Sequence, residues 1–237
     1  MPVDQRQDPS LSAMPDGATM FAEYENAVRR MLALGAAGTD PELPIPACPA
    51  WNARGIVSHV IGTAAWITSG EPLADDVQGW IDEEVLVRSG RSWRELRDEW
   101  DAVLPALRQK LGGQGGGGLV IDAVTHEQDL RAAIGPAVTD HTLGLSALLA
   151  SIIEHVRQLE PFGDGPGARL LTPTSVVTIG GPQIGVEAEL SDDWELSRLL
   201  GCRRSAAQLD ALPHRGDRAL LYTLVSRYPL PEAPLDL

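Results

Sequence analysis

The sequence has few cysteines and little positive charge. Only Cys48 and Cys202 occur among the 237 residues, and they lie far apart. This suits a reducing compartment better than a disulfide framework. Acidic residues outnumber basic ones 33 to 19, which gives a formal net charge of -14, and no basic block interrupts the acidic surplus. Nucleic acids and anionic membranes are therefore not expected as partners.

Long apolar runs are also missing. No segment approaches the length of a membrane-spanning helix, and the opening residues lack the cationic start and apolar run of a secretion signal. Residues 1–17 are polar and are expected to form a flexible leader. A cytoplasmic protein without membrane partners is the prediction.

Glycine and proline divide the remainder into an α-rich part and a mixed last third. Apolar residues at helical spacing predict helices over residues 18–38, from Asn52 as an N-cap, from Ser92 with Glu95 as a capping box, up to Gly135, and over 139–160. Beyond "PFGDGPGA", β-branched segments and a Gly-Gly-Pro turn predict strands, followed by a short helix in "DDWELSRLLG". The expected fold class is α+β, mainly α, with a helical bundle over residues 18–162 and a small α+β domain over 168–237.

Common catalytic motifs do not apply. The glycines of "GGQGGGG" match GxGxxG but follow a helix instead of a strand, "GLSAL" lacks the last glycine of a nucleophile elbow, and "HEQDL" has no second histidine. A dinucleotide site, a serine hydrolase and an HExxH metalloprotease are therefore not predicted.

The segment "IDAVTHEQDL" places Asp122 and His126 one turn apart on a helix. Side chains four residues apart have Cβ atoms about 5 to 6 Å from each other, so both can reach one ion. In the second helix, His59 lies between Gly55 and Gly62, which indicates a close approach to that helix. Two interpretations stay open: an internal hydrogen bond with a core histidine, or a bundle-core metal site with one open position.

Three segments resemble one family. "PIPACPAWNARGIVSHVIG", "THEQDLRAAIG" and "WELSRLLGCRRSAAQLDAL" resemble, in this order, segments of the mycothiol-dependent maleylpyruvate isomerase family. The resemblance implies a DinB-like four-helix bundle followed by a small SCP2-like α+β domain. It also implies a divalent metal, usually zinc, held by His59, Asp122 and His126. Asp122 stands where the family commonly has Glu, so metal preference and affinity are expected to differ.

The resemblance further implies a function. Mycothiol, the small thiol of actinobacteria, would enter the open metal position as a thiolate and act on a small electrophilic substrate, in a transfer or an isomerisation. Two alternatives stay open: a metal-dependent hydrolase, and a non-catalytic metal- or ligand-binding module of the same fold. The oligomeric state is not predicted.

Several further residues are weighed against ordinary roles. Asp129 either orients an imidazole or is solvated, and Cys48, between prolines without a neighbouring histidine in sequence, is interpreted as a packing residue. The others are candidate substrate arginines, a reserve ligand and candidate pocket aromatics, each also compatible with surface or packing roles: Arg54, Arg131, His155, Trp51, Trp66 and Trp80.

Overall fold

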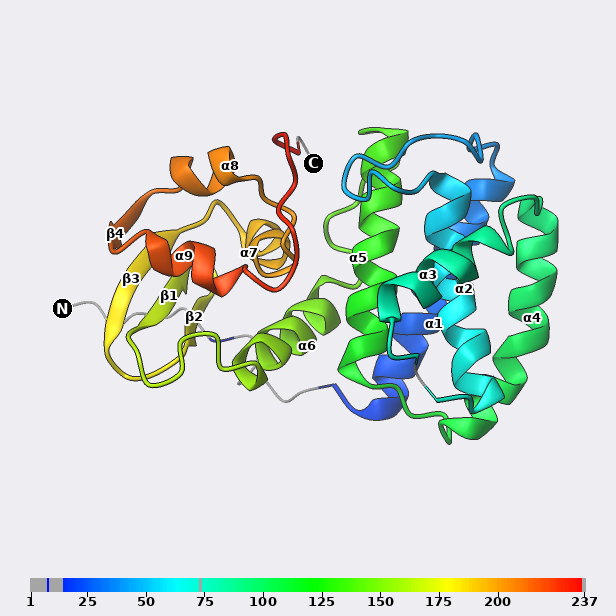
Figure 1. The fold of residues 1–237 in the computed structure, drawn as a ribbon, viewed down its shortest axis with the longest axis horizontal. Coiled ribbons are helices and arrows are strands. Elements are labelled where there is room, and N and C mark those ends of the chain that lie inside the picture. The colour runs from blue at the N-terminus through cyan, green and yellow to red at the C-terminus, as the bar shows by residue number, and fades with distance from the viewer. Residues whose placement is uncertain (1–7, 9–14, 73, 236–237) are drawn as a thin grey trace. The chain divides into compact units, whose positions relative to one another are not determined.

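The computed structural model describes residues 8, 15–72 and 74–235. Most of the expected leader, residues 1–7 and 9–14, therefore lies outside the described residues, and the first helix begins at Gly17. The chain falls into two compact units that divide between Asp140 and His141 (Figure 1). No helix in the described part of the chain has both the length and the apolarity needed to cross a membrane.

The first unit, Asp16–Asp140, contains a four-helix bundle. Its long helices are α1 (Gly17–Ala36), α2 (Ala53–Ser69), α4 (Trp93–Lys110) and α5 (Gly117–Ile134). Helix α1 packs against α5 and α4, while α2 packs against α4 and α5 (Figure 1). The short helix α3 (Val77–Leu86) lies on α2 and buries none of its own residues, so no apolar stripe marks it in the sequence.

The helix starts follow the local sequence signals. Asn52 accepts a hydrogen bond from the backbone of Gly55 and caps α2, as predicted. Ser92 and Glu95 form the predicted capping box at the start of α4, where each side chain satisfies a backbone donor near the other. These caps fix where α2 and α4 begin. The cap at Asn52 thereby sets the position of His59 within α2.

The bundle core contains large side chains from all four long helices. Tyr24 and Trp100 meet edge to face, with ring centroids 5.8 Å apart. Other fully buried side chains include Met31, Ile56, Ile61, Leu96, Leu107 and Leu130. Polar side chains are buried in the bundle as well: Glu127, Gln128 and Asp129 on α5 are almost fully inaccessible to solvent.

The second unit is a small mixed sheet with helices. The strands β1 (Gly167–Leu171), β2 (Val176–Ile179), β3 (Ile184–Glu189) and β4 (His214–Gly216) lie in the order β2-β1-β3-β4. β1 pairs antiparallel with β2 and parallel with β3, and β3 pairs antiparallel with β4. The helices are α6 (Leu145–Gln158), α7 (Asp193–Leu200), α8 (Ala206–Ala211) and α9 (Ala219–Leu224). The α+β, mainly α class is confirmed.

Helix α6 differs in place from the sequence prediction. It begins at Leu145 instead of near residue 139, and it packs against α7 and β2 within the second unit. The division after Asp140 therefore lies well before the boundary expected at residue 162. An apolar helical stripe predicts that a helix is buried, but it does not say which neighbour buries it. Strand β4 and helix α9 were not predicted; both are short, with three and six residues.

Gly35 of α1 lies so close to a neighbouring ring that a larger residue does not fit. A Cβ on Gly35 of α1 would lie 2.4 Å from the ring of Trp93 on α4, whereas a Cβ on Gly118 of α5 would meet nothing within 4 Å. We expect Gly35→Ala to destabilise the protein by about 1 to 3 kcal/mol through overpacking. Gly118→Ala, the matched control, should stabilise it by about 0.4 to 1 kcal/mol. Urea unfolding midpoints measure both; equal shifts of the same sign would contradict the packing argument.

Candidate metal centre

Helices α2 and α5 bring His59, Asp122 and His126 together. The Nε2 atom of His59 lies 3.0 Å from Asp122 Oδ1, and Nε2 of His126 lies 3.5 Å from the same oxygen. One potential ligand atom from each residue lies within 4.8 Å of the other two. The i, i+4 spacing on α5 and the helical position of His59 thus place the three predicted residues at one point.

The separations match those of ligand atoms around a small cation. For a tetrahedral ion with bonds of about 2.0 to 2.2 Å, nitrogen and oxygen ligands lie about 3.4 Å apart. The observed separations of 3.0 and 3.5 Å bracket this value. Two imidazoles and one carboxylate are also a common ligand set of zinc sites that keep a fourth position open.

The site is buried on the histidine side and more open at the carboxylate. His59 and His126 are 7% and 9% exposed, while the Asp122 side chain is 23% exposed. The Nδ1 atom of His59 is buried and has no hydrogen-bond partner among the described residues. Burial by itself lowers the pKa of His59, but the charge and hydrogen bond of Asp122, with a contribution from Glu84, outweigh it and raise that pKa.

A short loop covers the two imidazoles. Trp51 stacks on His59 with ring centroids 4.9 Å apart and meets His126 edge-on at 5.6 Å. The proline-rich loop closes on itself: the N–H of Ile45 donates to the Trp51 carbonyl, and the N–H of Trp51 donates to the Cys48 carbonyl. These bonds hold the indole over the site and shield His59 from water.

The structure places two further residues, Asp129 and Cys48, beside His126. Asp129, for which solvation was an open interpretation, is buried, and its Oδ2 lies 3.4 Å from His126 Nδ1. Cys48, interpreted as a packing residue, has its Sγ 4.0 Å from the same nitrogen and 3.8 Å from Asp129 Oδ2. The histidine that Cys48 approaches lies 78 residues away in sequence, so local sequence context could not reveal it.

The glycines on either side of His59 serve helix packing. A Cβ on Gly62 would come within 2.6 Å of Glu84 Oε2 and 3.0 Å of the Arg88 guanidinium. One on Gly55 would lie 3.2 Å from Asn52 Oδ1 and 3.3 Å from the side chains of Trp51 and Val85. The neighbours of Gly62 lie on or shortly after α3. The close approach at Gly62 is therefore that of α3, and at Gly55 it is shared between α3 and the segment before α2.

The candidate substrate arginines are engaged elsewhere. Arg54 pairs with Glu42. Arg131 donates to Glu127, a fully buried carboxylate that Arg30 also binds. Both arginines therefore have structural partners.

The remaining sequence candidates lie outside the triad as well. Trp66 and Trp80 pack on each other, with ring centroids 5.4 Å apart. His155 is exposed on α6 and is not part of the triad.

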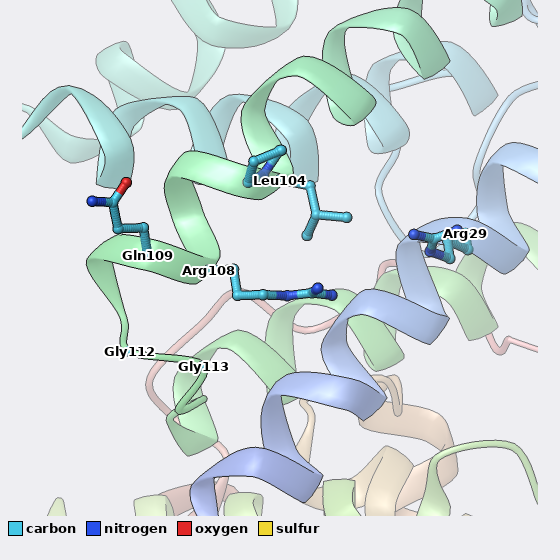
Figure 2. A pocket seen from close by; sticks show the side chains of 7 residues that line it. Arg29, Leu104, Arg108, Gln109, Gly112 and Gly113 are labelled. Atoms are coloured by element: carbon cyan, nitrogen blue, oxygen red, sulfur yellow. The ribbon is translucent and has the colours of Figure 1, made fainter.

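A pocket of about 640 Å³ opens elsewhere on the bundle, between α1 and α4 (Figure 2). Arg29 and Arg108 contribute to its lining, and both bind the single carboxylate of Glu25. None of the triad residues lines it. This pocket is separate from the candidate metal centre.

The fold is similar to that of solved enzymes. A crystal structure of the mycothiol-dependent maleylpyruvate isomerase aligns with a TM-score of 0.55 and 13% identity, over 84% of this chain and 93% of that chain. A histidine-to-alanine mutant of that isomerase aligns with a TM-score of 0.54 and 11% identity, over the same shares. No protein-family model matches the sequence, and no curated protein matches it significantly. The likeness in fold that the three sequence segments implied is confirmed.

The Asp122 contact makes a prediction for the metal-free protein. Because the pKa of His59 is raised, its proton stabilises the folded state at low pH; this contribution is complete below the unfolded-state pKa and is lost as pH rises through the folded-state pKa. An NMR titration of the His59 ring should give a midpoint above the ordinary value of 6.5, and Asp122→Asn should lower it. A midpoint at or below the ordinary value in the unmodified chain would contradict the assigned contact.

Proposed function

We propose that this protein is a metal-dependent enzyme that uses a small thiol of the mycothiol kind. The thiol would either be transferred to a small electrophilic substrate or catalyse the isomerisation of that substrate. The proposal rests on one observation, the convergence of His59, Asp122 and His126 from two helices of the bundle. The fold of the solved mycothiol-dependent isomerase supports the choice of thiol.

The residues fit a divalent cation, and zinc suits the nitrogen and oxygen donors best. Metal-bound histidines usually donate their second ring N–H to a carboxylate, and Asp129 lies where it can accept from His126 Nδ1. A proton on Nδ1 directed at this carboxylate would leave the lone pair of His126 on Nε2, the atom that faces Asp122. In that tautomer, His126 would present Nε2 to the cation at the distances described above.

The cation, when bound, would favour the thiolate form of a thiol that enters its open position. The chain's own residues would prepare that position. His59 and His126 would supply neutral ring nitrogens, and Asp122 would supply the negative charge at the more exposed side of the site. Trp51 would keep water off His59, which strengthens electrostatic interactions inside the site.

Asp122 would also distinguish this site from relatives with Glu. One methylene less shortens the reach of the carboxylate, and the 3.0 Å contact with His59 indicates that α2 and α5 lie close enough to compensate. We therefore propose that the site still binds a cation, with a preference shifted from that of a Glu-containing site.

Metal content tests the site directly. We expect the purified protein to bind one divalent cation at the triad, and His126→Ala to lose it, because two ligands do not hold the ion against buffer. His155→Ala is the matched control, since His155 is exposed and outside the triad. Metal analysis by mass spectrometry measures all three; equal metal content at the triad in His126→Ala and in the unmodified chain would remove the basis of the proposal.

Thiol binding tests the reaction class. A cobalt-loaded Cys48→Ala variant should gain a sulfur-to-cobalt charge-transfer band when mycothiol is added, and adding His126→Ala should abolish that band. The Cys48→Ala background ensures that any such band comes from the added thiol, because Cys48 lies near His126. If cobalt binds but its absorption spectrum does not change when mycothiol is added, the site would instead be a hydrolytic or non-catalytic metal site.

A further inference from the structure

His126 has potential metal ligands on both sides of its ring. Its Nε2 faces Asp122 and His59, as described above. Its Nδ1 faces a different pair: Asp129 Oδ2 at 3.4 Å and Cys48 Sγ at 4.0 Å. The cysteine sulfur and the Asp129 oxygen are 3.8 Å apart, and, as in the first group, the three potential ligand atoms lie within 4.8 Å of one another.

The geometry of this second group is that of a ligand set. With bonds of about 2.3 Å to sulfur and about 2.1 Å to nitrogen or oxygen, tetrahedral ligands lie about 3.6 Å apart when one is sulfur and about 3.4 Å apart otherwise. The observed sulfur separations of 4.0 and 3.8 Å exceed this by a few tenths of an ångström, and the nitrogen-to-oxygen separation of 3.4 Å equals it. A small movement of the Cys48 side chain closes the difference.

We propose that Cys48, His126 Nδ1 and Asp129 form a second cation site, which takes a thiophilic divalent ion such as zinc, cobalt or cadmium. The thiolate and the buried carboxylate would give this position two negative charges, compared with one at the triad. Sulfur ligands select softer cations than an imidazole and carboxylate set does. The two positions therefore differ in preference although they share one imidazole.

The local fold preorganises this site and gives it an entrance. Asp129 is 1% exposed and His126 is 9% exposed, so the ligands from α5 are fixed by packing. Cys48 is partly exposed and belongs to the loop that closes through its bonds to Ile45 and Trp51. An ion would reach the site past Cys48 and then meet the two buried ligands.

Occupation of the second site would change His126. The Cys48 thiol and the His126 Nδ1–H would each lose a proton to solvent, since metal ligands bind in their deprotonated forms. Asp129 would then bind the cation instead of accepting the imidazole N–H. A thiophilic cation at this position would therefore alter the charge of the His126 ring that the triad uses.

Cobalt titration without any small thiol tests the second site. The metal-free protein should bind two cobalt ions and show a sulfur-to-cobalt charge-transfer band. Cys48→Ala should bind one ion and lack the band, and Cys48→Ser should also lack it, while Cys202→Ala, the matched control, should keep both ions and the band. One retained ion in the Cys48 variants shows that they are folded.

His59→Ala separates this inference from the proposed function. Because His59 belongs to the triad alone, its loss should remove one cobalt ion and leave the sulfur band. A single ion in the unmodified chain, with a band that disappears in Cys48→Ala and persists in His59→Ala, would support the second site and contradict the triad. No sulfur band in the unmodified chain, or a band that Cys48→Ala leaves intact, would overturn the inference.

Discussion

The contact between His59 and Asp122 is the constraint on which the centre of the bundle depends. A carboxylate that is largely removed from water is costly unless a partner compensates its charge. Here the partner comes from another helix, 63 positions earlier in the chain, at 3.0 Å. The contact therefore ties α2 to α5 at one depth, and it sets the relative register of the two helices that carry all three triad residues.

Around this contact, the bundle carries an unusual amount of buried polarity on one helix. Glu127, which directly follows His126 in the sequence, is fully buried and accepts hydrogen bonds from Arg30 and Arg131. Its neighbour Asp129 faces His126 instead. Helix α5 thus sends alternate acidic side chains to different partners, one group structural and one at the candidate metal centre.

Much of this could be predicted from the sequence, and the failures have physical causes. The long helices, their caps at Asn52 and Ser92, and the meeting of Asp122 with His126 follow from periodicity and spacing along a single segment. The place of α6 in the second unit and the position of Cys48 beside His126 depend on contacts between distant segments. The glycines around His59 signalled a close approach, but only the structure identifies α3 and the segment before α2 as the neighbours.

The loop before α2 sets the spacing of two side chains that lie beside His126. Cys48 and Trp51 are three residues apart in sequence. The hydrogen bond from the Trp51 N–H to the Cys48 carbonyl closes the turn between them. Both side chains lie beside His126, one through its sulfur and one through its indole ring. An insertion or deletion between them would displace both contacts at once. The length of this turn, more than the identity of most residues in the bundle, is what a diverging chain must preserve to keep the centre intact.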